Sequence, residues 1–208
     1  MKYKKLLWPT VIGLLPILMG LAVYSKLPEK MPIHWGLDGE PNGYATRLAG
    51  ILILPLIMVG VNVIVQIRLE SASKTNLKLE KFMLWVLPIL SVTFQSLTLS
   101  EAIGYHLDIA LITMVTVGII FILLGNYIPK TSQNIVAGFR FPMTLSNPDN
   151  WQKTNRLGGM MLVISGIIMI LGGVISTWYP IVAVLTFIVI LVLIILVPLC
   201  YSIRLARK

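Results

Sequence analysis

Apolar residues occur along the chain in six continuous runs, each about as long as one bilayer crossing. A helix needs about 20 mostly apolar residues to cross the hydrocarbon layer. The runs that meet this length cover residues 6–25, 48–67, 82–100, 109–125, 157–177 and 181–203. They are continuously apolar rather than alternating, which favours helices over the strands of a barrel. The sequence therefore predicts an all-α, polytopic membrane protein with six transmembrane helices.

The positive charges predict how these helices are oriented. The chain has a net charge of +9, which in a soluble protein would suggest a nucleic-acid partner. With the N-terminus placed inside, however, 14 of the 17 basic residues fall on the cytoplasmic side, and only Lys26, Lys30 and Arg47 fall outside. This distribution follows the positive-inside rule. We therefore expect both termini in the cytoplasm of a cell whose plasma membrane holds the protein, and anionic lipid rather than nucleic acid as the partner of the charge.

Two long loops divide the sequence. Residues 1–81 hold the first two helices and an external loop at 26–47, and residues 82–208 hold helices three to six and a cytoplasmic loop at 125–159. Loops of this length in a compact protein are usually functional or disordered. Because both loops contain aromatic residues, we expect both to be structured.

Each loop carries local signals. The external loop begins with prolines that favour extended backbone, and Asp38-Gly39 and Asn42-Gly43 are typical turn dipeptides, so the pattern predicts a small turn-rich cap. In the cytoplasmic loop, the segment that starts at Asn147 is typical of a helix start, with a capping asparagine and then a proline at the first helical position. That helix would place Trp151 at the membrane interface.

Small and polar residues inside the predicted spans indicate how the helices pack. Glycines recur every seven residues on two spans, at Gly13 and Gly20 and at Gly159, Gly166 and Gly173. Such a face allows close helix contact, although glycine is also generally frequent in membrane helices. Polar residues on the second and third spans are expected to form interhelical hydrogen bonds; they are Asn62, Gln66, Ser91, Gln95 and Thr98.

The sequence offers little catalytic chemistry. Phosphate-loop, dinucleotide and zinc-protease patterns are absent, and the single cysteine, Cys200, excludes an internal disulfide and a cysteine zinc site. His34 and His106 fall on the external side near carboxylates, so a mixed metal site stays open, but their spacing favours simple hydrogen bonding. We expect no enzymatic activity, no metal and no cofactor.

Four stretches resemble a known family. Gly125-Asn-Tyr-Ile-Pro-Lys, Asn134-Ile-Val-Ala-Gly-Phe-Arg-Phe-Pro-Met-Thr-Leu and Asn150-Trp-Gln-Lys-Thr-Asn-Arg-Leu-Gly-Gly resemble the signature of the SdpI family of bacterial membrane proteins. Leu27-Pro-x-x-Met-Pro-Ile-His-Trp resembles the small domain of unknown function that often precedes this signature. With the six-helix layout, these matches cover nearly the whole chain.

The resemblance implies a toxin-immunity protein that is also a signal receptor. It implies two partners, a secreted membrane-active peptide outside and a small DNA-binding autorepressor held at the membrane inside. The external residues expected to face the peptide are Pro32, His34, Trp35, Gly39 and Arg47. The expected cytoplasmic signature residues are Asn126, Asn134, Gly138, Arg140, Pro142, Thr144, Trp151, Asn155 and Arg156.

A carrier or exporter of a small or lipidic molecule is the alternative. Prolines that can kink membrane helices support it; they are Pro16, Pro55, Pro88 and Pro198. Against it, no charged residue or histidine lies near the middle of any predicted span, where coupled carriers usually need one.

Overall fold

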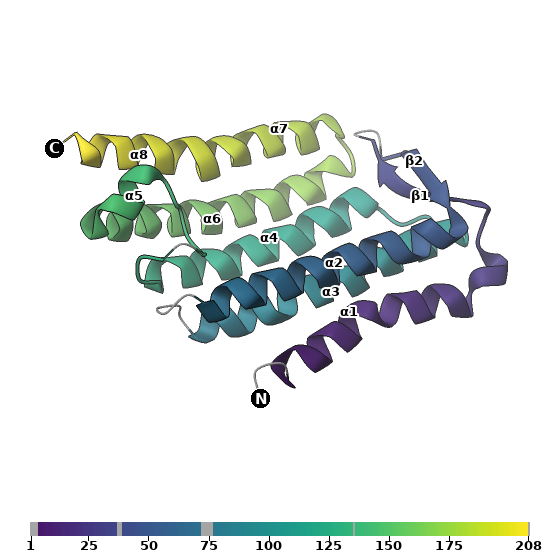
Figure 1. Cartoon of the computed structure of the whole chain (residues 1–208). Helices are drawn as coiled ribbons and strands as arrows, with labels where there is room; N and C mark the ends of the chain where they lie inside the picture. Colours follow the sequence, from purple (N-terminus) through teal and green to yellow (C-terminus); the bar gives the residue numbers. More distant parts are fainter. Residues whose placement is uncertain (1–3, 37–38, 72–76, 135, 208) are drawn as a thin grey trace. The chain divides into compact units, whose positions relative to one another are not determined.

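Six helical segments of membrane-crossing length are present in the computed structural model, which describes residues 4–36, 39–71, 77–134 and 136–207. Five are single helices: α1 (Lys4–Ala22), α2 (Arg47–Ser71), α3 (Leu77–Ala102), α4 (Ile109–Tyr127) and α6 (Pro148–Ser176) (Figure 1). The sixth consists of α7 (Ile181–Leu191), a π-helical turn η3 (Val192–Leu196) and α8 (Val197–Ala206). The predicted polytopic helical fold is confirmed.

The chain divides into two compact units. The first contains residues 1–67 and 81–109, with α1, α2 and most of α3, and the second contains residues 68–80 and 110–208. A boundary at residue 81, as the sequence suggested, does not match this packing. The reason is that α3 is bonded to the two helices before it: Ser91 donates to the carbonyl of Gly13 at 2.7 Å, and Gln95 donates to the carbonyl of Gly50 at 2.8 Å.

Three of the five predicted polar residues, Asn62, Ser91 and Gln95, form interhelical hydrogen bonds, and their acceptors are main-chain carbonyls rather than one another. Nε2 of Gln66 has no hydrogen-bond partner among the described residues. The amide nitrogen Nδ2 of Asn62 donates to the carbonyl of Leu84 at 3.3 Å. That carbonyl lacks its helical donor, because the residue four positions later is Pro88, which has no N–H. Asn62 on α2 thus supplies the hydrogen bond that the proline removes from α3.

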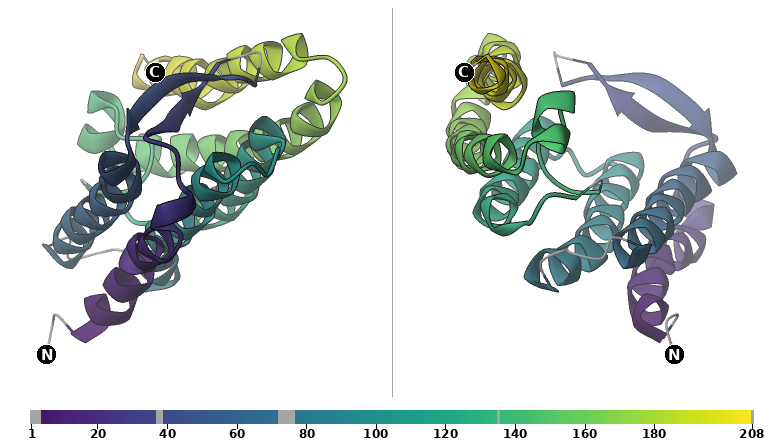
Figure 2. Two further views of the ribbon diagram at one scale, coloured as in Figure 1. Left: turned by 90° about the vertical axis from the view of Figure 1, so that its right-hand side faces the viewer. Right: turned by 60° about the vertical axis from the view of Figure 1, so that its left-hand side comes forward.

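The external loop forms a β-hairpin. Strand β1 (Lys30–Trp35) pairs in antiparallel register with β2 (Pro41–Thr46), with irregularities on either side of His34 (Figure 2). The prediction of a turn at Asn42-Gly43 was wrong, since both residues lie in β2. Gly43 is needed there because a Cβ at this position would lie 2.9 Å from the Cβ of His34. Asp38, the other predicted turn position, lies outside the described residues.

The base of the hairpin is fixed to the helices of its unit. Met31 is fully buried in an apolar cluster with Leu27, Ile51 and Leu99. A Cβ on Gly50, in the first turn of α2, would lie 2.9 Å from the Cβ of Met31. The absence of a side chain at Gly50 therefore lets β1 pack directly on the helix backbone.

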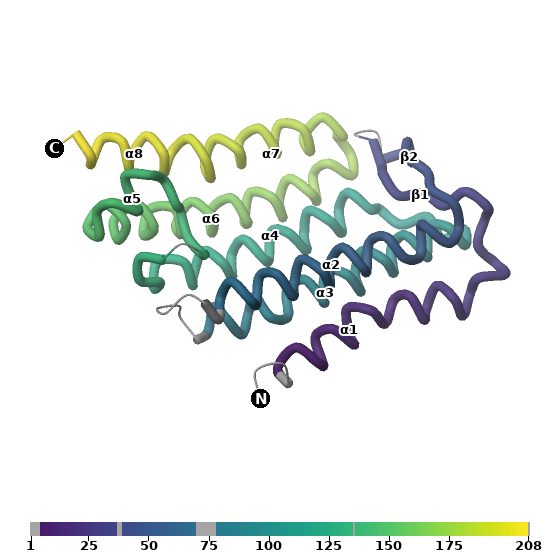
Figure 3. The backbone as a smooth tube through the Cα atoms, viewed as in Figure 1, coloured from purple at the N-terminus to yellow at the C-terminus, as the bar shows by residue number. Residues whose placement is uncertain are grey.

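The predicted glycine contacts are present in the second unit. Helices α4 and α6 run side by side, and their backbones touch where Gly118 meets Gly166 and where Gly125 meets Gly159 (Figure 3). A methyl group on Gly125 would lie 2.5 Å from the carbonyl oxygen of Gly159. The seven-residue spacing on α6 is therefore a packing face, continued by Gly173 against Met114.

The orientation in the membrane stays a prediction with a direct test. In a Cys200→Ser background, a cysteine at position 42 is expected to react with a membrane-impermeant thiol reagent in intact cells, because the positive-inside rule places the hairpin outside. A cysteine at position 78 is expected to react only after the cells are opened. The reverse pattern would invert the predicted topology.

Candidate functional site

The signature segment between α4 and α6 contains a 3₁₀ turn, η2 (Ile128–Lys130), and a short helix, α5 (Pro142–Ser146). Helix α6 begins where the sequence predicts. The side-chain oxygen of Asn147 accepts hydrogen bonds from the N–H groups of Asp149 at 2.9 Å and Asn150 at 3.2 Å. Pro148 occupies the first helical position, where a missing N–H costs nothing.

Trp151 is a buried anchor of this segment. We expected it at the membrane interface, but only 2% of the residue is exposed, and its indole N–H donates to the carbonyl of Thr131 at 3.0 Å. A buried indole needs such a partner, since an unpaired N–H would carry a desolvation cost of about 1–3 kcal/mol. Trp151 therefore fastens the chain after η2 to the first turn of α6.

Asn155, one turn further along α6, holds the irregular stretch before α5. Its Oδ1 accepts the N–H of Phe139 at 2.8 Å, and its Nδ2 donates to the carbonyl of Trp151 at 3.0 Å. The neighbouring Gly138 has a φ of 125°, and a Cβ there would lie 2.5 Å from Asn155 Oδ1. Only glycine fits this close approach without strain.

Thr144 and Gln133 organise α5. The hydroxyl of Thr144, which is fully buried, accepts the N–H of Phe141 at 2.9 Å and lies 2.8 Å from the carbonyl of Phe139. The side chain of Gln133 donates to the carbonyls of Thr144 at 2.8 Å and Leu145 at 2.7 Å. These carbonyls lie at the end of α5 and have no donor within so short a helix.

Asn134 closes the turn at the start of the same stretch. Its Oδ1 accepts the N–H groups of Val136 and Ala137, both at 2.8 Å, and its Nδ2 donates to the carbonyl of Ser132 at 2.8 Å. This is an Asx turn, in which the asparagine side chain fixes the course of the backbone that follows it. Asn134, Gly138, Thr144, Trp151 and Asn155 are thus the internal frame of the segment.

Sequence reasoning missed the connection between this frame and α8. Asn150, on α6, donates to the carbonyl of Ser202 at 2.9 Å and accepts the Ser202 hydroxyl at 2.9 Å. Thr154 donates to the same amide oxygen at 2.9 Å. The signal was present in the spacing of Asn150, Trp151, Thr154 and Asn155, which repeats at helical intervals and marks one buried face.

The remaining predicted cytoplasmic residues lie on the surface. Asn126, Arg140, Pro142 and Arg156 are exposed, and Asn126 Nδ2 donates to the carbonyl of Ile122 within its own helix. The carboxylate of Asp149 pairs with Lys153 at 2.7 Å. The segment therefore presents two guanidinium groups, on Arg140 and Arg156, which are suited to a carboxylate or a phosphate.

The predicted external residues divide in the same way. Pro32 is buried, and Arg47 is structural: its Nε donates to the carbonyl of Pro28 at 3.3 Å, and its guanidinium lies 5.0 Å from the ring centre of Tyr24 in the short helix η1 (Tyr24–Lys26). His34 and Gly39 are exposed, and Trp35 is half-buried. The exposed part of this set is the side of β1 around His34.

A metal site is not formed by the described residues, which contain no cluster of three His, Cys, Asp or Glu side chains. His34 Nδ1 instead lies 2.5 Å from Asn42 Oδ1. His106 Nδ1 lies 3.5 Å from a carboxylate oxygen of Glu101. His34 thus hydrogen-bonds within the hairpin, and His106 is an exposed side chain near one carboxylate.

These features define a multi-pass helical membrane protein with a hydrogen-bonded segment between its fourth and fifth crossings and a hairpin between its first two. Residues 130–202 match the SdpI/YfhL protein family, and residues 11–59 match the domain of unknown function DUF1648. The chain is 31% identical over 170 residues to "Immunity protein SdpI" of Bacillus subtilis (strain 168), covering 80% of each protein. The chain belongs to the SdpI/YfhL family.

A shorter relative matches part of the chain. The "Uncharacterized membrane protein YbgB" of Bacillus subtilis (strain 168) is 36% identical over 55 residues, which are 26% of this chain and 58% of that protein. No solved structure matches the chain.

Proposed function

We propose that the protein confers resistance to a secreted, membrane-active peptide and reports the presence of that peptide to the cytoplasm. The external hairpin receives the peptide, and the signature segment presents a surface to a small DNA-binding repressor. The protein carries out no chemical reaction in this role. The observation that carries the proposal is the similarity to an immunity protein across 80% of both chains, and the separation of internal and exposed residues in the signature segment supports it.

The physical layout suits such a role. The hairpin is hydrogen-bonded to the start of α2, where the N–H of Arg47 donates to the carbonyl of Glu29 at 3.0 Å. A ligand that displaces β1 would therefore also displace the first turn of a crossing helix. The signature segment is held by its own internal hydrogen bonds, so its exposed arginines occupy defined positions. A ligand shifts such a protein only if it binds two arrangements with different affinity.

Expression of the protein in a sensitive bacterium is expected to raise survival against peptides of the sporulation-delaying type. Pro32→Gly tests the hairpin: it removes a buried side chain of β1 without changing charge and is expected to lower the protection. The measurement is survival across a peptide dilution series beside a membrane immunoblot. Unchanged survival with abundant protein against several such peptides would rule out the immunity role.

Arg140→Ala is expected to impair relocation of the repressor to the membrane more than it impairs survival, because Arg140 is exposed on the signature segment, which the charge distribution places on the cytoplasmic side. Lys153→Ala is the control, since it removes one positive charge from the same segment and breaks only an exposed ion pair, which contributes little to stability. If Arg140→Ala lowers abundance and survival together, the residue fastens its own segment and does not bind the repressor.

A carrier function is the second candidate, and one observation favours it. Three buried carboxamides of the first unit each have an atom without a hydrogen-bond partner: Asn62 Oδ1, Gln66 Nε2 and Gln95 Oε1. Unpaired polar atoms inside a membrane helix bundle are costly, so they mark places where a solute or water would bind. Gln95→Leu separates the two functions: it is expected to abolish protection if the peptide is carried through this core, and to preserve it if the hairpin is the receiving site.

A further inference from the structure

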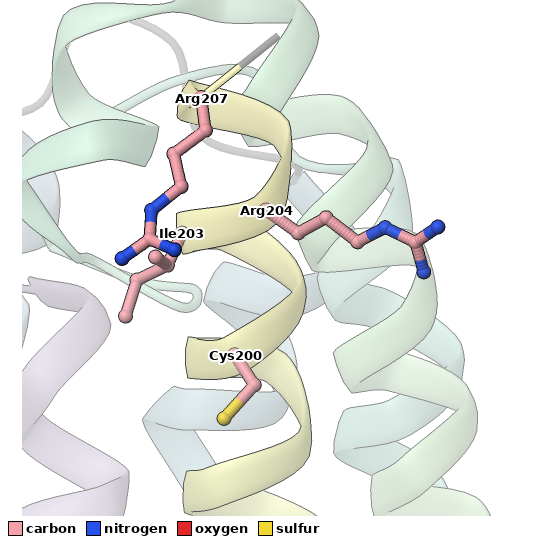
Figure 4. A pocket seen from close by; sticks show the side chains of 4 residues that line it. All are labelled: Cys200, Ile203, Arg204 and Arg207. Carbon is pink, nitrogen blue, oxygen red and sulfur yellow. The ribbon is translucent and has the colours of Figure 1, made fainter.

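A stripe of four residues at the end of α8 combines apolar and basic side chains. Cys200, Ile203, Arg204 and Arg207 follow the i, i+3, i+4, i+7 spacing of one helix face. They line a hollow of about 350 Å³. Figure 4 shows Cys200 one turn deeper in α8, Arg207 folded back toward Ile203, and Arg204 extended toward the other side of the helix.

The rotation of α8 is fixed, so this stripe has a defined direction. Ser202 is fully buried and exchanges two hydrogen bonds of 2.9 Å with Asn150. With 100° between successive helical residues, Ser202 lies on the side of α8 opposite the centre of the stripe. The stripe therefore faces away from α6, and Cys200, Arg204 and Arg207 are exposed.

The two arginines have no protein partner among the described residues. Neither guanidinium makes a hydrogen bond or an ion pair there. Both lie at the end of a segment of membrane-crossing length, residues 181–206, where phospholipid headgroups lie. Leu196, four residues before Cys200, continues the same face with 51% of its surface exposed. The surface is thus apolar toward the membrane centre and cationic at the interface.

We propose that this stripe binds one anionic glycerophospholipid. The phosphate pairs with Arg207, whose side chain folds back toward Ile203, and Arg204 adds a second positive charge near the same end of α8. An acyl chain runs over Ile203, Cys200 and Leu196. Arginine suits this role because its planar fork of N–H donors pairs with two phosphate oxygens at once. Basic residues close to the surface favour anionic over zwitterionic lipid, whereas the apolar lining requires a lipid rather than free phosphate.

The site also has a structural consequence. Its helix carries Ser202, which holds the first turns of α6 through Asn150, so a lipid bound to α8 stabilises the arrangement that supports the signature segment. Anything that binds the folded state and not the unfolded state raises the midpoint of unfolding. Binding of anionic lipid should therefore be visible as both lipid retention and thermal stabilisation.

The test uses the full chain in detergent with added phosphatidylglycerol or phosphatidylcholine, examined by native mass spectrometry. The wild type is expected to retain one phosphatidylglycerol in preference to phosphatidylcholine. Arg204→Gln with Arg207→Gln is expected to lower this preference by on the order of tenfold, because two surface basic residues are lost. Cys200→Trp, which fills the hollow without changing charge, is expected to lower retention of the same lipid.

Arg156→Gln is the matched control, because it removes an exposed arginine that does not line the hollow. It is expected to retain phosphatidylglycerol as the wild type does, with the same rise in unfolding temperature. Inorganic phosphate alone is expected to give no rise. Equal retention of the two lipids, an equal loss in Arg156→Gln, or full stabilisation by inorganic phosphate would each overturn the proposal.

Discussion

Replacing Gly166 by alanine is expected to lower the free energy of unfolding by about 1–3 kcal/mol, the usual range for overpacking, and to reduce the amount of protein in the membrane. The added methyl group would meet the carbonyl oxygen of Gly118 on α4 at less than contact distance. A flexible side chain can move away from such a contact, but a helix backbone cannot. Relief therefore requires α4 and α6 to separate, which loosens the contacts along the whole face.

Gly60→Ala is the control for this effect. Gly60 also lies inside a crossing helix, α2, but a Cβ there meets nothing within 4 Å. The substitution is therefore expected to leave the free energy of unfolding unchanged, or to raise it slightly because alanine restricts the unfolded chain. Unfolding in graded denaturant after purification in detergent measures both variants. Equal stability of Gly166→Ala and Gly60→Ala would contradict a backbone contact between α4 and α6.

A double-variant cycle sharpens the result. Gly118→Ala places its methyl group 2.8 Å from the carbonyl oxygen of Gly166, on the same contact. If the first substitution already separates the helices, the second finds the space open. The double variant is therefore expected to lose less free energy of unfolding than the two single variants lose together, because the effects of neighbouring substitutions are generally not additive. Full additivity would place the two glycines on independent contacts.

The helical part of the fold follows directly from the sequence because lipid leaves the backbone few choices. Every main-chain polar group within the hydrocarbon must be paired inside its own segment, so a long apolar run predicts a helix without knowledge of its neighbours. The start of α6 was predictable for a related reason: the Asn147-Pro148 cap is a local feature. The glycine face was predictable as a face, but its partner on α4 was not, since spacing on one helix does not identify the other.

The hairpin shows where local signals fail. Asn-Gly usually indicates a tight turn, yet Asn42-Gly43 lies within β2 because the side chain of Asn42 reaches His34 and the missing Cβ of Gly43 admits the same residue. Both reasons depend on the opposite strand. Register between strands is a nonlocal property, and nothing within residues 41–46 specifies it.

The sequence identifies the signature residues, but it does not show which of them are buried and which are exposed. Asn155 and Arg140 are both polar residues in one loop, and the sequence does not show that the first is buried and the second exposed. The structure separates them through Phe139, whose N–H needs an acceptor and finds one in Asn155. The choice depends on how the loop folds back on α6, which no single-residue pattern encodes.

Asn155→Leu is expected to make the signature segment sensitive to protease and to lower the free energy of unfolding by about 1–3 kcal/mol. The change keeps the approximate side-chain volume but removes both hydrogen bonds of the carboxamide. The part-buried N–H of Phe139 loses its acceptor, and an unpaired polar group costs about 1–3 kcal/mol, whereas the carbonyl of Trp151 keeps the backbone N–H of residue 155 as its helical partner. The stretch that holds Gly138 is then no longer bonded to α6.

Asn155→Asp distinguishes the two bonds. A carboxylate still accepts the Phe139 N–H but cannot donate to the Trp151 carbonyl, so an intermediate loss is expected, and it should diminish at a pH low enough to protonate the side chain. Gln152→Leu, at an exposed position of the same helical turn, is the control and should leave the cleavage rate unchanged. Limited proteolysis of inside-out vesicles measures the rate between residues 134 and 156. If Asn155→Leu is cut no faster than the wild type, Asn155 is not what holds this segment, and its order must come from Trp151 and Thr144 alone.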